Sequence, residues 1–236
     1  MKKFAYTLSV AVIVFIATAL SSLAQSTENR QVAGFNRIAS AGPFTVHVKI
    51  DGTESLKISN KPDVIKFIET VVEDGTLKIK FKDDLENGQG ESDRPIDIYI
   101  TAKSLSCLAN TGSGSIDVDG NVTGNDVSIV LNGAGSIKSS VKSGNLQVIM
   151  SGAGRTNLSG TVDKAKVLIN GAGEMNGRDL KTKDAAVTIS GSANVYFSAD
   201  NTVSANIIGS GSVYYSGTAT IASSNVIGAG GVSKAN

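Results

Sequence analysis

A glycine-centred repeat fills the second half of this 236-residue chain and constrains its fold more than any other feature. The repeated element has the form Gly-Ala/Ser-Gly, with alanine in the third place of one copy. Seven copies begin at Gly112, Gly133, Gly152, Gly171, Gly191, Gly209 and Gly228. Successive copies are 18 to 21 residues apart. Self-similarity at such a period is the signature of a repeat architecture.

Apolar residues keep fixed positions relative to each repeated glycine. One ladder lies two residues before it: Asn110, Leu131, Met150, Ile169, Ile189, Ile207 and Val226. A second lies four residues after it: Ile116, Ile137, Thr156, Met175, Val195, Val213 and Val232. A third, looser ladder consists of Val122, Val141, Val162, Leu180, Val203 and Ile221. Each period therefore predicts three short strand segments joined by turns.

This pattern predicts an all-β fold in which residues 108–236 form a right-handed parallel β-solenoid of about seven short coils. A single coil cannot bury its apolar side chains, but stacked coils bury them in a continuous core. Glycine suits a sharp corner where a Cβ would clash or φ is positive. The absence of proline after residue 95 suits coils that hydrogen-bond to both neighbours. A glycine-rich sandwich of hairpins is the alternative, although it would not require even spacing.

Residues 25–107 have a different composition and predict a smaller β-rich region. They contain all three prolines of the chain. Apolar and polar residues alternate over 44–50, 77–81 and 96–100, as in half-buried strands. Asp74-Gly75 predicts a hairpin turn. Residues 61–68 can hold one short helix, and the polar, acidic segment 82–94 predicts a solvated loop.

The N-terminus has the layout of a secretory signal peptide. Lys2 and Lys3 precede an apolar run over residues 4–20, and Ser22 and Ala24 place small residues at a cleavage site. We therefore expect residues 1–24 to be removed and the protein to be periplasmic or extracellular. An uncleaved membrane anchor is the alternative. No other segment is apolar enough to span a bilayer, so no integral membrane span is expected after cleavage.

Composition excludes several kinds of site. One cysteine and one histidine exclude an internal disulfide and any metal centre that needs several thiolates or imidazoles. A formal charge of +1 with 18% charged residues argues against a nucleic-acid partner. No predicted helix follows the glycine elements, so they are not phosphate-binding loops. We expect no cofactor.

Catalysis is not expected either. Glycoside cleavage needs two carboxylates roughly 5–10 Å apart. The acidic residues of the repeats fall mostly at different offsets: Asp117, Asp119, Asp126, Asp163, Glu174, Asp179, Asp184 and Asp200. The acidic segment 82–94 lacks the spacing of a calcium-binding EF-hand loop, although oxygen ligands for Ca²⁺ are present.

One outward position of the repeat carries the candidate binding residues. Five residues after the first glycine come Asp117, Lys138, Asn157, Asn176, Tyr196, Tyr214 and Ser233. Stacking of coils should place Tyr196 on Tyr214 and turn Phe197 and Tyr215 into the core. Exposed tyrosines beside Asn157 and Asn176 suit contact with a glycan or a protein. Cross-strand stacking for stability is the alternative interpretation.

The last two coils carry a second candidate surface. The residue before the first glycine is polar in most copies but becomes Ile208 and Ile227 at the end. The final coil would also present unpaired backbone groups at its outer edge. We expect this end to be covered, either by the first half of the chain or by a second subunit, which would make the protein a homo-oligomer.

The sequence also resembles a known family. The resemblance rests on GFNRI at 34–38, GPFTV at 42–46, IETVVEDGTLKI at 68–79, and the repeats NGAG at 132–135 and SGAG at 151–154. These residues are similar to those of the "putative auto-transporter adhesin, head GIN domain" proteins of Bacteroidota. The resemblance implies an extracytoplasmic β-helical protein with an adhesive role. We therefore expect a non-catalytic binding or structural protein of the cell envelope, with a glycan or envelope protein as partner. A carbohydrate-active β-helix enzyme and an envelope scaffold or regulatory protein are the alternatives.

Overall fold

The computed structural model describes residues 26–83 and 95–235, which are almost entirely β-structure with one short helix, α2 (Pro62–Ile65). The predicted signal peptide and most of the acidic segment 82–94 lie outside these residues. The strands are β1 (Ser26–Arg30), β2 (Arg37–Ala41), β3 (Phe44–Ile50), β4 (Ser55–Asn60), β5 (Ile68–Glu73), β6 (Thr76–Phe81), β7 (Ile96–Ala102), β8 (Cys107–Gly112), β9 (Ser115–Gly133), β10 (Ser136–Gly152), β11 (Arg155–Gly171), β12 (Glu174–Gly191), β13 (Asn194–Gly209), β14 (Ser212–Ser216), β15 (Thr220–Ile227) and β16 (Gly231–Lys234).

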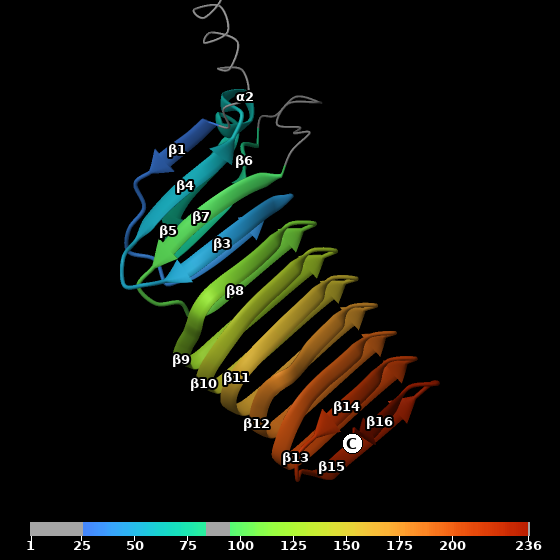
Figure 1. The fold of residues 1–236 in the computed structure, drawn as a ribbon. Coiled ribbons are helices and arrows are strands. Elements are labelled where there is room, and N and C mark those ends of the chain that lie inside the picture. Colours follow the sequence, from blue (N-terminus) through green and yellow to red (C-terminus); the bar gives the residue numbers. More distant parts are fainter. Residues whose placement is uncertain (1–25, 84–94, 236) are drawn as a thin grey trace, which may run out of the picture.

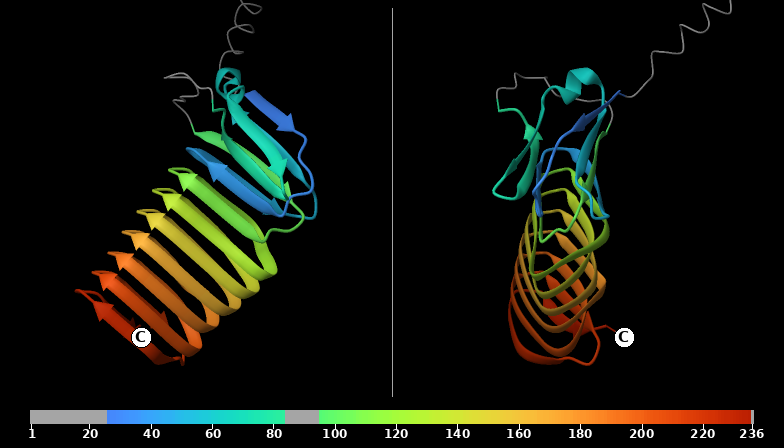
Figure 2. Two further views of the ribbon diagram at one scale, coloured as in Figure 1. Left: turned by 180° about the vertical axis from the view of Figure 1, so that it is seen from behind. Right: turned by 90° about the vertical axis from the view of Figure 1, so that its left-hand side faces the viewer.

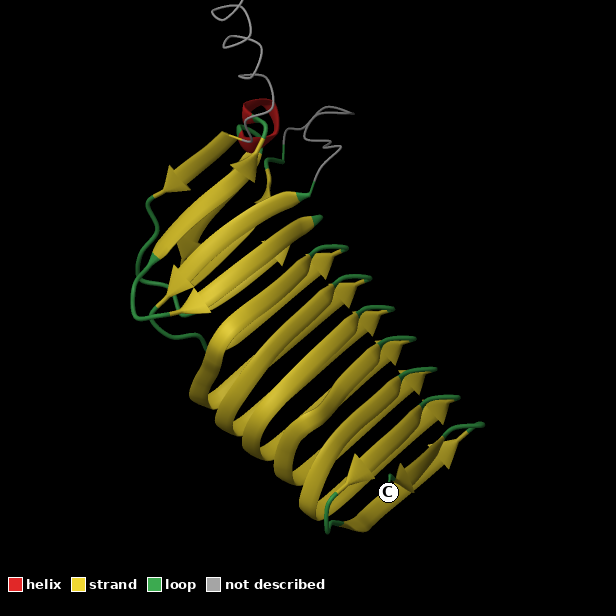
Figure 3. Cartoon of the chain, viewed as in Figure 1, coloured by secondary structure: helices red, strands yellow, loops and turns green. Residues whose placement is uncertain are grey.

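Strands β9 to β13 each run around almost a whole coil, and each pairs in parallel with the next (Figure 1). The pairing places each repeated glycine beside its counterpart in the next coil, from Gly133 to Gly209. Short loops join the coils at the glycine corners (Figure 3). The predicted parallel β-solenoid of about seven turns is confirmed. The alternative of a hairpin sandwich is wrong for this half of the chain.

Each coil is a flattened loop with two long sides (Figure 2). In coil β9 the first side consists of residues 115–119, with Ile116 and Val118 buried, and the second of residues 126–133, with Ile129 and Leu131 buried. The residues of the three predicted ladders supply this core and are buried from β9 to β13. The first two ladders are in register from coil to coil, but the third is not: Val141 pairs with Gly160, Val162 with Thr182 and Val203 with Ala185. Asn110 is a polar exception at full burial, and its Nδ2 donates to the carbonyl oxygen of Gly114 at 2.6 Å.

The glycine corners show why the first place of the repeat must be glycine. Gly171 has φ +128°, and a Cβ there would lie 2.3 Å from the carbonyl oxygen of Gly152 in the preceding coil. The third place does not require a positive φ, and Ala193 occupies it in one coil with no exposed surface. Tight stacking of backbone on backbone between coils therefore requires glycine at the first place of the repeated element.

The first half of the chain extends the two sides of the solenoid. On the first side β3 pairs in parallel with both β9 and β7, and on the second side β2 pairs in parallel with both β8 and β6. Antiparallel strands β4 and β1 and the β5–β6 hairpin end the stack. Asp74 and Gly75, at φ 47° and 71°, form the predicted hairpin turn. The predicted short helix is α2.

This region lies at the opposite end of the molecule from the C-terminal coil (Figures 1 and 2). The expectation that the first half covers the last coil is therefore wrong. The reason is topological: β3 pairs in parallel with the start of β9, so the first half is stacked beside the earliest coil.

Glu54 holds the loop between β1 and β2 in place. Its carboxylate lies 2.5 Å from Nζ of Lys103 and accepts hydrogen bonds from the backbone N–H groups of Gly34 and Phe35. The hydrogen bond from Lys103, together with those two N–H groups, holds the pKa of Glu54 below its usual value.

Candidate binding surfaces

A straight row of outward side chains runs along the first side of the molecule, with one residue from each strand. We call it the axial row. Its members, each in register with the next, are Asn29, Lys57, Tyr99, His47, Asp117, Lys138, Asn157, Asn176, Tyr196, Tyr214 and Ser233. The structure thus brings together all the residues predicted from Asp117 onward. It also adds four residues of the first half that sequence reasoning did not connect with them.

The C-terminal part of the row is held together by stacking and hydrogen bonds. The rings of Tyr196 and Tyr214 stack with centroids 4.9 Å apart and planes 10° from parallel. Nδ2 of Asn176 donates to Oδ1 of Asn157 at 3.3 Å. Phe197 and Tyr215, the following residues, are buried as predicted. The predicted aromatic stack is therefore present.

Arg178 belongs to this cluster and was missed by sequence reasoning. Its guanidinium carbon lies 3.8 Å from the Tyr196 ring centre, and its Nη1 donates to Oδ1 of Asn176 at 3.0 Å. Arg178 on β12 and Tyr214 on β14 flank Tyr196 on β13, so both faces of that ring are covered. The cluster therefore offers ring edges, hydroxyl groups and amide groups to a partner. Period-2 alternation after Asn176 was the signal that could have identified Arg178.

A second aromatic cluster lies in the N-terminal part of the row. His47 stacks on Tyr99 with centroids 4.9 Å apart, and Nζ of Lys57 lies 4.6 Å from the Tyr99 centroid on the other side. His47 Nε2 lies 3.2 Å from Oδ1 of Asp97. A surface hollow of about 580 Å³ adjoins this cluster. His47 points outward as predicted, but it contributes to a stack that the sequence did not reveal.

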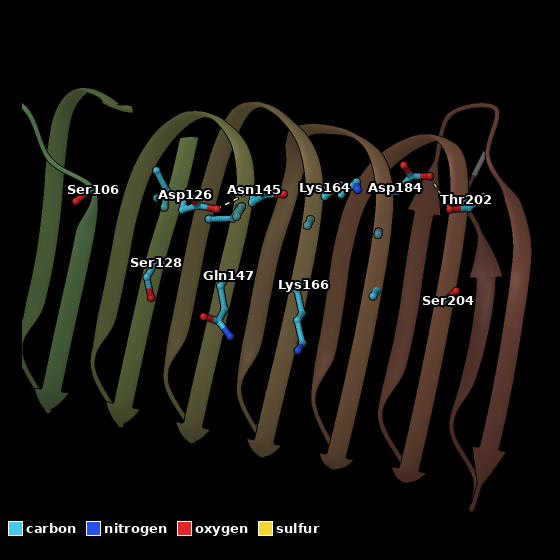
Figure 4. Close-up of a pocket in the computed structure, with 15 residues that line it drawn as sticks. Ser106, Asp126, Ser128, Asn145, Gln147, Lys164, Lys166, Asp184, Thr202 and Ser204 are labelled. Carbon is cyan, nitrogen blue, oxygen red and sulfur yellow. Dashed lines mark hydrogen bonds between the residues drawn. The ribbon is translucent and has the colours of Figure 1, made fainter. Parts of the chain in front are cut away.

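A groove of about 540 Å³ runs along the second side across five coils (Figure 4). We call it the axial groove. One edge consists of Asp126, Asn145, Lys164, Asp184 and Thr202. The other edge consists of Ser128, Gln147, Lys166, Ala186 and Ser204. Between the edges, the floor is formed by Val127, Leu146, Ala165 and Ala185.

Hydrogen bonds fix the carboxylates of the groove. Asp126 accepts from Nδ2 of Asn145 at 2.8 Å and from Nδ2 of Asn125 at 2.9 Å, and these two bonds lower its pKa. Oγ1 of Thr202 donates to Oδ1 of Asp184 at 2.6 Å. The two carboxylates stand three coils apart, which is about 14 Å at the usual strand spacing. This separation exceeds the roughly 5–10 Å of a glycosidase pair.

Sequence reasoning did not find the groove, although a signal was present. The residues of its first edge all lie seven positions before a repeated glycine.

Within residues 26–83 and 95–235, no three histidine, cysteine, aspartate or glutamate side chains gather in an arrangement that could hold a metal ion.

The last two coils carry an apolar surface. Ile208 is 49% exposed and Ile227 is 59% exposed, and the two are in register on β13 and β15. Ile221 and Val226 of β15 are also exposed. No other part of the described chain covers these side chains.

The fold and its surfaces define a class of protein: an elongated parallel β-solenoid with rows of outward side chains in register. The chain belongs to the family described as "Putative auto-transporter adhesin, head GIN domain", whose model matches residues 34–219. The family resemblance stated from the sequence is therefore confirmed. No curated protein matches the chain.

Solved structures share the fold. A crystal structure described as a putative adhesin from Bacteroides fragilis has a TM-score of 0.82 and 22% identity, covering 91% of this chain and 98% of that one. One described as a putative lipid binding protein from Parabacteroides distasonis has a TM-score of 0.72 at 22% identity, with the same coverage. A putative adhesin from Parabacteroides merdae has a TM-score of 0.67 at 18% identity, again covering 91% and 98%. At these identities the similarity shows the fold alone.

The family is described as a putative adhesin family, which fits a non-catalytic, adhesin-like role and an extracellular or envelope protein. In the part of the chain that the structure describes, no helix is long and apolar enough to cross a membrane.

Proposed function

We propose that this protein is a non-catalytic, adhesin-like binding protein of the cell envelope, exported from the cytoplasm. Its contact surface for a glycan or an envelope protein is the C-terminal part of the axial row, Asn157, Asn176, Tyr196 and Tyr214, together with Arg178 beside it. The observation that carries the proposal is the register of the four axial-row side chains, which successive coils hold in one line.

Rigidity supports this assignment. The five side chains stand on strands that hydrogen-bond to both neighbouring coils, so little conformational entropy is lost when a partner binds. The cluster combines two phenol hydroxyls, two amides and one guanidinium. Such groups on a partly apolar base suit an amphipathic surface such as a sugar or a protein patch.

A glycan array and a pull-down from envelope extract test the proposal directly. We expect the double variant Arg178→Ala/Tyr214→Ala to lose at least tenfold in affinity for whatever the parent captures. Tyr99→Ala is the matched control, because it removes a stacked tyrosine from the other end of the same row. Equal binding by the parent and the double variant would refute the proposed contact surface. Cleavage of a captured glycan would favour the carbohydrate-active enzyme instead.

The location has its own test. If residues 1–24 are a signal peptide, the exported protein begins at Gln25, and intact-mass analysis of the periplasmic and secreted fractions should show that mass. Recovery of the full-length chain from the inner membrane would contradict an exported, soluble protein.

A further inference from the structure

We propose that the axial groove is a second binding site, for a linear neutral glycan that lies along the solenoid axis with one sugar residue per coil. The site lies on the second long side, across the core from the axial row, and does not rest on the function proposed for that row. Four observations carry the assignment: the shape of the groove, its free polar groups, its charge and its repeat.

The shape follows from a flat floor of strand backbone between two rows of outward side chains, which leaves a continuous channel. The floor residues are in register and at most 5% exposed, so their side chains point into the core: Val127, Leu146, Ala165 and Ala185. Since the backbone N–H and C=O groups of this floor pair between coils, the C–H face of a sugar ring can lie on it without leaving a polar group unpaired.

The edges supply hydrogen-bonding groups on both sides of that channel. Carboxylate, amide, ammonium and hydroxyl groups follow one another along the first edge, while Ser128, Gln147, Lys166 and Ser204 line the second (Figure 4). Within the described residues, Gln147, Lys164 and Lys166 make no hydrogen bond or ion pair through their side chains, so their donors are free. A glycan with hydroxyl groups along both of its sides can form hydrogen bonds with the polar groups of both edges.

The net charge of the groove and the spacing of the coils limit the class of ligand. The two carboxylates of the groove are balanced by the ammonium groups of Lys164 and Lys166, so a polyanion gains nothing from it. The coils repeat at about 4.8 Å, whereas an extended peptide repeats at about 3.4 Å and would fall out of step with them. A glycan rises by one sugar residue over a distance close to one coil. An acyl chain would leave the polar edges without partners.

Calorimetric titration with neutral linear oligosaccharides of two to seven residues tests the site. The panel consists of β-1,4-linked glucose, mannose, xylose and N-acetylglucosamine. The groove spans five coils, or about 19 Å, so affinity for the preferred sugar should rise with each residue up to about five and then level off. Raising the salt concentration tenfold should change that affinity by less than twofold.

A matched pair of variants separates this groove from other surfaces. Ala186 lies on the second edge, exposed and outward, so Ala186→Tyr should block the channel and weaken binding at least tenfold. Ser190→Tyr is the control, because Ser190 is also exposed on β12 but lies about 13 Å further along the strand. It should stay within twofold of the parent, and so should the axial-row variant Arg178→Ala/Tyr214→Ala.

Several results would overturn the assignment. Absence of millimolar binding to every member of the panel would do so, as would an affinity that does not depend on length. Binding only to an acidic glycan, weakened by salt, would refute the neutral class. Capture of neutral phospholipid vesicles that Ala186→Tyr abolishes would identify an acyl chain as the occupant instead.

Discussion

Replacing Gly171 by alanine should destabilise the solenoid far more than replacing Gly173, although the two glycines lie in the same corner. At Gly171 the backbone has φ +128°, and a Cβ would lie 2.3 Å from the Gly152 carbonyl oxygen. At Gly173 the nearest atoms would be the Gly154 carbonyl oxygen at 2.9 Å and the flexible end of Met150 at 3.0 Å. Only the first clash combines a rigid neighbour with a backbone conformation that alanine rarely adopts.

The loss in the free energy of unfolding can be approximated for each variant from these contacts. For Gly171→Ala, backbone strain of about 1–3 kcal/mol adds to overpacking of about 1–3 kcal/mol, so we expect a loss of about 2–6 kcal/mol. For Gly173→Ala, overpacking of about 1 kcal/mol is offset by about 0.4–1 kcal/mol from the reduced entropy of the unfolded chain. Ala193, buried at the equivalent place of the next coil, shows that the backbone accommodates this methyl group.

Equilibrium unfolding in urea, followed by circular dichroism, measures both changes. We expect Gly173→Ala to keep a midpoint close to that of the parent and Gly171→Ala to unfold at a much lower urea concentration. Stacked coils couple to their neighbours, so the slope of the transition must be compared as well. Coincident midpoints for the two variants would refute the reasoning that stacking of backbone on backbone sets the first glycine.

Three further expectations follow from the structure. Ile169 is buried in the middle of the stack, so Ile169→Asp should cost several kcal/mol, whereas Asn176→Asp on the axial row should stay within about 0.5 kcal/mol; equal denaturation midpoints would show that the inward and outward assignments are wrong. If the exposed Ile208 and Ile227 meet a second subunit, replacing both by Asn should lower the mass measured by light scattering, and an unchanged mass and protease pattern would make the two residues incidental. Since the pKa of Glu54 is lowered in the folded protein, its stabilising contribution is present above the unfolded pKa and is lost as pH falls through the folded pKa. Hydrogen exchange of the backbone amides in residues 31–36 should therefore speed up in acid beyond its intrinsic pH dependence, and Glu54→Gln should remove most of that excess.

The core of the solenoid could be predicted from the sequence because it repeats. Leu131, Met150, Ile169, Ile189 and Ile207 are all buried at the offset from glycine that the sequence indicates. The glycine corner sets the phase of each coil, and stacking then requires a similar side chain at the same offset. Where the repeat ends, the prediction weakens: Val226 has the right offset but lies on the last coil and is exposed.

The arrangement of the first half could not be predicted in the same way. Its strands alternate clearly, yet the order in space is β4, β7, β3, β9, which departs from the order in the sequence. Parallel pairing of β3 with both β7 and β9 joins segments far apart in the chain, and no period in the sequence records such a pairing. The hydrogen bonding therefore passes without a break from the first half into the repeat.

The two surfaces show why outward positions are harder to identify than inward ones. A buried position holds a similar residue in most coils, so the repetition of that residue identifies the position in the sequence. The outward pair Tyr196 and Tyr214 could be identified in the same way, because adjacent coils carry the same residue there. The edges of the axial groove instead hold complementary residues, such as Asp126 beside Asn145 and Asp184 beside Thr202. Core packing places no demand on these positions, so their side chains can vary from coil to coil as hydrogen bonds between coils and, in our proposal, a bound glycan require. To find a functional surface in a β-solenoid, one should therefore also compare the unlike residues that successive coils place at the same distance from the repeated glycine.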